Sequence, residues 1–190
     1  MKIKNTYTGF TRIIDIGRFA FFIEFNSTGV NIDLKELTQQ ASHFNRIVLS
    51  GGEPFEERED IQKLIKSIFA NNPQAKFEIH TNGTIHPLGI GKFKNIIYNV
   101  FVQLKNDGVL YTDRIKPDIL NWLNDMNANF IFKIHNDDDV DEAFSIINDF
   151  EISKSQVFLM PSSEAINVSL KRAQYHGYNF TIPLGVDFNG

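Results

Sequence analysis

The sequence predicts an α/β protein with a mostly parallel sheet, folded as one domain over residues 1–190. A chain of this length can bury a sizeable core, and 42% hydrophobic with 22% charged residues is typical of soluble globular proteins. Short runs rich in β-formers alternate with amphipathic stretches, which implies right-handed crossovers between parallel strands. Six or seven such units form a doubly wound sheet or a partial barrel, because a complete barrel needs eight.

The first half of the chain contributes two expected strands and two expected helices. Residues 19–25 (FAFFIEF) are dominated by aromatic and apolar side chains and predict the first strand. A helix is expected over 31–44, where one apolar stripe contains Ile32, Leu37, Ala41 and Phe44. Residues 46–49 (RIVL) predict a short buried strand, and apolar residues at helical spacing predict a helix over 56–70 that Asn71, Asn72 and Pro73 terminate.

The second half continues the same alternation. Further strands are expected over 76–80, 96–104, 129–135 and 156–160. Helices with an apolar face are expected over 116–127 and 138–149. The acidic run Asp137, Asp138 and Asp139 is interpreted as a cap for the second of these helices rather than a cation site. No linker-like segment marks a domain boundary.

Composition excludes several classes of function. The net charge of -4 is spread along the chain, so no basic stripe exists to bind a nucleic-acid duplex. No run approaches the ~18 apolar residues of a membrane span, and we expect a cytoplasmic protein. With no cysteine, disulfides, thiolate nucleophiles and thiolate-ligated metal sites such as sulfur-ligated zinc are excluded. The five histidines are scattered, so we expect no metal site.

Polar residues collect where the expected strands end. In parallel α/β folds these loops share one edge of the sheet, where ligands bind. The loops are Ser50-Gly51-Gly52-Glu53-Pro54, Thr81-Asn82-Gly83-Thr84, Gln103-Leu104-Lys105-Asn106, Lys133-Ile134-His135-Asn136 and Met160-Pro161-Ser162-Ser163. The candidate ligand-binding residues within them are Ser50, Gly51, Gly52, Glu53, Thr81, Asn82, Lys105, His135 and Met160.

Each of these motifs also has a plain structural interpretation. Two glycines allow close backbone approach or positive φ, and Glu53 can accept a hydrogen bond from an ammonium group. In the alternative interpretation, the same residues only make a tight turn from strand to helix, with Glu53 exposed to solvent. Asn-Gly is a standard turn pair. Lys105 either pairs with a carboxylate or is a solvated loop residue. His80 and His135 end strands and could act as acid or base, or be satisfied by the backbone.

The order of the motifs resembles the radical S-adenosylmethionine (SAM) superfamily, closest to the 7-carboxy-7-deazaguanine synthase branch of queuosine and deazapurine metabolism. The resemblance rests on residues 17–25 (GRFAFFIEF), Ser50-Gly51-Gly52-Glu53-Pro54, His80-Thr81-Asn82-Gly83-Thr84 and Leu159-Met160-Pro161, and covers nearly the whole chain. It implies a partial (β/α)6-type barrel with a mostly parallel curved sheet. It also implies that Gly51, Gly52 and Glu53 form the turn for the methionine amino group of SAM, with Thr81, Asn82 and Lys105 nearby.

The sequence departs from this family where the chemistry is performed. The resemblance implies an iron–sulfur cluster on a three-cysteine loop after the first strand, but the segment after Phe25, Asn26-Ser27-Thr28-Gly29-Val30-Asn31, is short and has no cysteine. Glu24 stands where the family often carries arginine, which reverses the charge near a carboxylate-bearing substrate. Gln103-Leu104-Lys105 keeps only the lysine of the family's Ser-Pro-Lys. We therefore expect no iron–sulfur cluster and no reductive cleavage of SAM.

Three hypotheses of function follow. The first is a cluster-free protein that retains a pocket for SAM or a related nucleoside, and the second is a partner-binding or regulatory protein in which the motifs persist as turns. We expect these two roles combined, with a protein partner or a homodimer. The alternative is a non-radical enzyme, or a divergent synthase-like protein of deazapurine metabolism, with His80 or His135 as acid or base.

Overall fold

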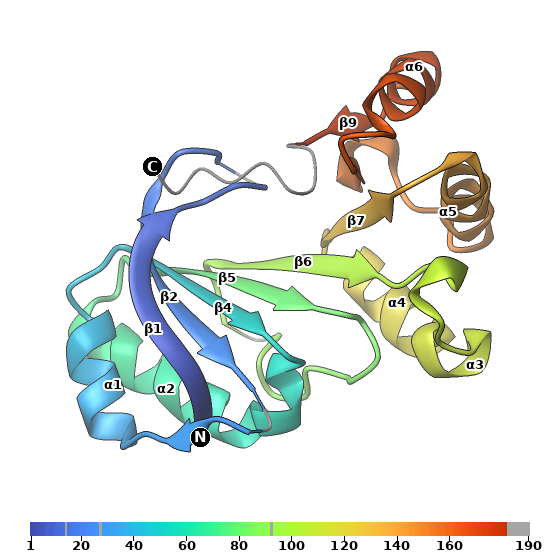
Figure 1. The fold of residues 1–190 in the computed structure, drawn as a ribbon. Coiled ribbons are helices and arrows are strands. Elements are labelled where there is room, and N and C mark those ends of the chain that lie inside the picture. The colour runs from blue at the N-terminus through green and yellow to red at the C-terminus, as the bar shows by residue number, and fades with distance from the viewer. Residues whose placement is uncertain (14, 27, 92, 182–190) are drawn as a thin grey trace. The chain divides into compact units, whose positions relative to one another are not determined.

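A computed structural model describes residues 1–13, 15–26, 28–91 and 93–181 (Figure 1). The chain divides into two compact units. The first contains residues 1–81 and 85–99, and the second contains residues 82–84 and 100–190. Strand β6, Ile96–Val102, passes from the first unit into the second. A single domain over the whole chain stays a prediction.

The first unit contains a sheet in which the expected strands lie parallel. Its strands are β1 (Lys2–Phe10), β2 (Phe19–Phe25), β3 (Val30–Asn31), β4 (Arg46–Gly51) and β5 (Lys76–Thr81). Their order is β3-β1-β2-β4-β5, with β2, β4 and β5 parallel and β1 antiparallel to both of its neighbours. Strand β1 was not expected from the sequence, because most of its side chains are exposed and it has no apolar pattern.

Helices cover one face of this sheet, on the same side of β2 and β4 in Figure 1. They are α1 (Leu34–Ala41), the 3₁₀ helix η1 (Pro54–Glu57) and α2 (Arg58–Asn71). The rings of Phe69 on α2 and Phe77 on β5 are 5.3 Å apart, and Phe44, just after α1, stacks on Phe21 of β2 at 5.0 Å. The side chains of β2, β4 and β5 that point to this face form the apolar core.

Helix α1 begins later than the apolar stripe predicted. Val30 and Asn31 pair with β1 instead of joining the helix, and Asp33 caps α1 by accepting a hydrogen bond from the Lys35 backbone N–H at 2.9 Å. The short segment after β2 therefore adds an edge strand before the helix starts.

The second unit repeats the strand-and-helix alternation. Its helices are η2 (Lys105–Asp107), α3 (Tyr111–Arg114), α4 (Pro117–Asp125), α5 (Asp137–Asp149), η3 (Lys154–Gln156) and α6 (Ile166–His176). Its own strands are β7 (Asn129–Ile134), β8 (Val157–Pro161) and β9 (Asn179–Phe180), which pair in parallel in that order. Elements α3, α6 and β9 were not expected from the sequence.

The acidic run does not supply the cap of α5, contrary to its interpretation above. The N-cap is Asn136, whose side-chain oxygen accepts from the Asp139 backbone N–H at 3.1 Å. Asp137, Asp138 and Asp139 occupy the first helical turn, where negative charge is favoured by the helix dipole.

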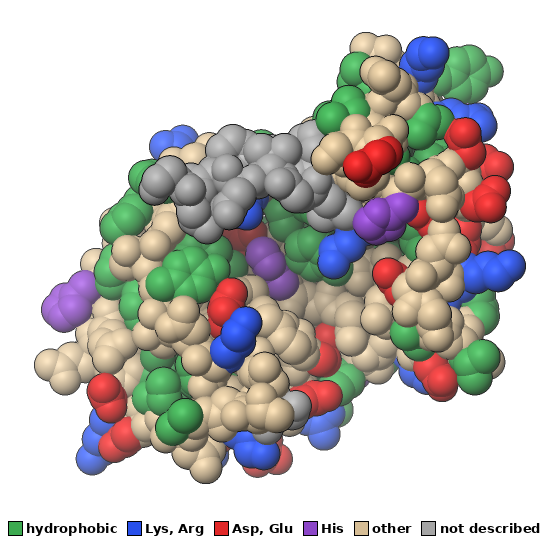
Figure 2. Space-filling model, viewed as in Figure 1, with side chains coloured by type: hydrophobic (Ala, Val, Ile, Leu, Met, Phe, Trp, Pro, Cys, Tyr) green, Lys and Arg blue, Asp and Glu red, His purple; other side chains and the backbone are tan. Residues whose placement is uncertain are grey.

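The fold class is mixed α/β with a mostly parallel sheet, as the alternation predicted. Within the described ranges, no helix is long and apolar enough to cross a membrane. On the face drawn in Figure 2, acidic and basic side chains are interspersed, in keeping with the even spread of charge along the sequence.

Candidate functional site

The two glycines after β4 have different roles. Gly51 has φ +82, and a Cβ on it would lie 2.5 Å from the Phe25 carbonyl oxygen. Gly52 donates its backbone N–H to the same carbonyl at 3.0 Å, and a Cβ on it would make only ordinary contacts. The expected close approach and positive φ thus both belong to Gly51, which brings the turn against the end of β2.

Glu53 is not the solvated turn residue that the alternative interpretation required. Its exposure is 8%, and its carboxylate accepts the Phe55 backbone N–H at 3.1 Å as the N-cap of η1. The Thr81 hydroxyl at the end of β5 lies 2.9 and 2.8 Å from its two oxygens. The structure therefore brings two candidate residues from neighbouring strand ends into direct contact.

A small pocket lies beside this turn. It encloses about 250 Å³ together with its open mouth, and it is lined by Lys2, Phe25, Asn26, Gly52, Glu53, Glu56 and Glu57. Three carboxylates face one ammonium group in this lining, so the pocket favours a cationic group over an anionic one.

The segment after β2 does not fit an iron–sulfur cluster. The Asn26 side chain accepts from the Thr28 backbone N–H at 3.0 Å and from its hydroxyl at 3.1 Å, while Ser27 lies outside the described residues. A Cβ on Gly29 would lie 2.6 Å from the backbone of Ile3, so this segment packs closely on β1. Its donors are amide and hydroxyl groups, whereas such clusters are held by thiolates.

The sheet face away from α1 and α2 carries a row of polar side chains. Glu24 of β2 lies opposite Ser50 of β4, and Leu49 lies opposite Ile79, so His80 of β5 follows in the same row. Glu24, Ser50 and His80 are all half-buried. Burial, and then the charge and hydrogen bond of Glu24, raise the pKa of Tyr7, whose hydroxyl donates to Glu24 at 3.3 Å.

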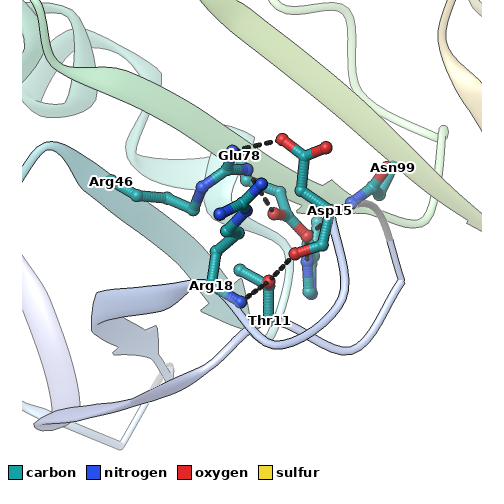
Figure 3. A network of polar contacts seen from close by, with 7 residues as sticks. Thr11, Asp15, Arg18, Arg46, Glu78 and Asn99 are labelled. Atoms are coloured by element: carbon teal, nitrogen blue, oxygen red, sulfur yellow. Dashed lines mark hydrogen bonds and ion pairs between the residues drawn. The ribbon is translucent and has the colours of Figure 1, made fainter.

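A buried charged network supports this row (Figure 3). Glu78, 1% exposed, accepts a hydrogen bond from the Asn99 side-chain amide at 2.7 Å and contacts His80 Nε2 at 2.9 Å. The Arg46 guanidinium lies 3.6 Å from Glu78 and also pairs with Asp15. Apart from His80, these residues were not predicted from the sequence, although the alternation in residues 76–81 (KFEIHT) places Glu78 and His80 on one face.

The remaining candidates lie in the second unit. Asn82 accepts from the Thr84 backbone N–H at 2.9 Å and from its hydroxyl at 2.6 Å, the pattern of a side-chain-supported turn. Met160 is buried opposite Lys133 in the β7–β8 ladder and belongs to the core of this unit. Asn82 therefore has the plain turn geometry that the motif also allowed.

Lys105 and His135 meet the beginning of α5. The backbone N–H of Lys105 donates to Glu142 at 2.6 Å, and that of His135 donates to Asp139 at 2.8 Å. Both side chains are exposed.

The pKa of Glu164 is lowered. The causes are first a hydrogen bond from its own backbone N–H, then one from the Ser162 hydroxyl, and then the charge of His135.

The predicted site residues thus fall into two groups. Ser50, Gly51, Gly52, Glu53 and Thr81 lie together in the first unit, and Asn82, Lys105, His135 and Met160 lie in the second. In the described ranges, no group of three or more His, Cys, Asp or Glu residues could hold a metal ion. That the predicted site residues bind a ligand stays a prediction.

Comparison with known proteins adds one result about the fold. No protein-family model and no curated protein sequence matches the chain. The crystal structure of QueE from Escherichia coli, a 7-carboxy-7-deazaguanine synthase and radical SAM enzyme, is similar with a TM-score of 0.71 and 13% identity. The match covers 95% of this chain and 92% of that chain. At this identity the likeness shows the fold alone, and it confirms the predicted radical-SAM-like fold.

Proposed function

We propose that this chain is a cluster-free, radical-SAM-like protein that binds SAM or a related nucleoside ligand without radical chemistry. The observation that carries the proposal is the Glu53 carboxylate, positioned by Thr81 and the Phe55 N–H in the lining of a pocket beside Gly52. Because the chain has no cysteine, it has no thiolate to hold the iron–sulfur cluster that would reduce SAM.

The size and charge of the pocket support binding of an amino group. The enclosed part of the pocket has about 20 Å³, room for little more than one water-sized group, whereas pockets that enclose a whole drug-sized ligand have roughly 300–1,000 Å³. The pocket therefore takes the ammonium head group, and the rest of the ligand extends outside it. Glu53 accepts a charge-assisted hydrogen bond from that head group, and Gly51 allows the turn to lie close to β2.

Calorimetric titration with SAM and S-adenosylhomocysteine tests this role. Glu53→Gln keeps the shape of the side chain but removes its charge, so we expect about 10–100-fold weaker binding of both ligands. Glu59→Gln is the matched control, because Glu59 is exposed and does not line the pocket. An absence of heat with folded wild-type protein, or equal affinities for wild type and Glu53→Gln, would contradict the proposal.

Exposed apolar residues support a second role in self-association. Phe10, Ile16 and Phe19 are 62%, 57% and 57% exposed, and the rings of Phe10 and Phe19 are in contact at 5.8 Å. Exposed apolar patches mark interaction sites. We propose that this patch, on the β1–β2 hairpin, is buried against a second copy of the chain.

Sedimentation measurements test the association. The wild-type chain should sediment as a dimer, and Phe10→Ser with Phe19→Ser should sediment as a monomer at the same concentration. Leu110→Ser is the control, because Leu110 is exposed but belongs to the second unit. A monomeric wild-type protein would exclude this role.

A further inference from the structure

We infer that two copies of the chain join along the outer edge of β1, which pairs antiparallel with β1 of the other copy and makes one continuous sheet. The inference rests on the proposed self-association, because it names the contact that brings the patch of Phe10, Ile16 and Phe19 against a second copy. It is carried by backbone groups of β1 that no other strand of the described residues covers.

Most of β1 is an open edge of the sheet. Its inner side pairs with β2 as far as Phe10, whereas on its outer side β3 pairs only with Lys2 and Ile3. Within the described part of the chain, no strand therefore covers residues 5–10 on that side. An uncovered edge strand presents a row of N–H and C=O groups that can pair with another extended chain.

The register identifies the groups that point outward. Thr11 donates its backbone N–H to the Arg18 carbonyl at 2.9 Å, so these two residues form a hydrogen-bonded pair of the β1–β2 hairpin. Hydrogen-bonded and non-hydrogen-bonded pairs alternate along an antiparallel ladder. Counted back from Thr11 without a register shift, Phe10, Thr8 and Thr6 belong to non-hydrogen-bonded pairs. Their backbone N–H and C=O groups consequently point away from β2.

The composition of this run favours pairing. Residues 5–10 (NTYTGF) contain no charged residue and no proline, which are common means by which edge strands avoid pairing. The irregularity of β1 lies between Ile3 and Asn5, before the run. Lys4 and Arg12 stand at its two ends, where like charges on two copies oppose a longer contact. The contact is therefore limited to the uncharged residues between them.

The occupant of this edge is a second copy, because the run is complementary to itself. Antiparallel pairing of identical strands follows twofold symmetry, so each copy offers the other the same donors and acceptors. When Thr8 of the two copies lie opposite each other, Thr6 of each lies opposite Phe10 of the other. The three outward residues of each copy then exchange about six hydrogen bonds.

The edge is continuous with the apolar patch. Phe10 belongs to both, because its backbone groups point outward while its ring contacts that of Phe19 at 5.8 Å. The ring of Phe19 in turn lies 6.0 Å from that of Phe44, so aromatic side chains extend from the edge across this face of the hairpin. Pairing of the edges buries Phe10 beside the other copy, and the burial of its ring adds to the backbone hydrogen bonds.

Thr8→Pro tests the inference, because proline has no backbone N–H and is accepted on an edge strand where that N–H faces outward. Pairing of β1 with β2 should be kept, as circular dichroism would show. The dissociation constant of the dimer, measured by sedimentation equilibrium, should rise about 100-fold or more. Thr8→Ala is the matched control, because it removes the same side chain but keeps the N–H, and its dissociation constant should stay within about threefold of wild type.

Two further measurements do not depend on the folding of the proline variant. Thr8→Lys leaves the backbone unchanged and places like charges at the twofold axis, so it should weaken the dimer about tenfold or more. In hydrogen exchange, the Thr6 and Thr8 amides should be protected in the wild-type dimer and exposed in the Phe10→Ser, Phe19→Ser monomer. The Tyr7 and Gly9 amides face β2 and should be protected in both.

Wild-type affinity in a folded Thr8→Pro variant, or rapid exchange of the Thr6 and Thr8 amides in the dimer, would overturn the inference. Protection of these amides in a wild-type monomer would also overturn it, because another segment of the same chain would then cover the edge. If Thr8→Pro dissociates the dimer and Phe10→Ser with Phe19→Ser does not, only the proposed role of the patch fails. If the reverse is found, only this inference fails.

Discussion

Gly51→Ala is expected to lower the free energy of unfolding by about 3 kcal/mol and the melting temperature by roughly 6–12 °C. Gly51 has φ +82, a conformation that costs an L-residue about 1–2 kcal/mol. The new Cβ would also lie 2.5 Å from the Phe25 carbonyl oxygen and 2.8 Å from the Phe25 nitrogen. Because both atoms belong to the backbone of β2, the clash is relieved only by moving the strand.

Two other glycines separate the two causes. Gly17 has φ +80 with nothing within 4 Å of its Cβ position, so Gly17→Ala should show only the conformational cost. Gly52→Ala should change stability least, because its Cβ would lie 3.6 Å or more from its neighbours. Thermal unfolding of the three variants checks this order. Equal destabilisation by Gly51→Ala and Gly17→Ala would mean that close packing against Phe25 contributes nothing.

Glu78→Leu is expected to destabilise the protein by about 3–5 kcal/mol, the usual effect of removing one partner from a buried ion pair. Glu78 is 1% exposed and Arg46 is 8% exposed. After the substitution, the buried Arg46 guanidinium keeps only one of these two ion-pair partners, the half-exposed Asp15. It also removes the carboxylate that accepts from Asn99 and orients His80. Denaturant unfolding monitored by circular dichroism measures the loss.

A double-mutant cycle tests the electrostatic cause. When Arg46→Leu is added to Glu78→Leu, no unpaired buried guanidinium remains, so the double variant should be more stable than the sum of the single effects predicts. Asp141→Asn is the control, because its pair with Arg172 is exposed at 3.7 Å and should contribute less than about 1 kcal/mol. Strict additivity at Arg46 and Glu78 would show that the two charges do not stabilise each other.

The sequence predicted the elements whose patterns are local. Strand β2 has the bounds expected from its aromatic run, and α2, Arg58–Asn71, lies within two residues of the expected bounds 56–70 at both ends. Strand β1 and helix α6 have few buried side chains, only Ser169 and Ala173 in α6, so neither had an apolar period to detect. Elements that lie at the surface are thus the ones missed.

The candidate site was predictable only in part, for a related physical reason. The turn at Gly51–Glu53 is a contiguous motif, and its glycine and carboxylate chemistry can be recognised without a fold. The network of Arg46, Glu78 and Asn99 depends on which strands are neighbours and in what register. That information is non-local, so a lone arginine or glutamate in a strand indicated nothing about its partner.

The proposed site binds SAM and leaves it intact. The most direct test is equilibrium dialysis against SAM after anaerobic treatment of the chain with iron, sulfide and a strong reductant, followed by chromatography of the recovered ligand. We expect SAM to be retained with the protein, less so by Glu53→Gln, and to be recovered uncleaved. Formation of 5′-deoxyadenosine and methionine, or no retention of SAM by the folded wild-type chain, would contradict it.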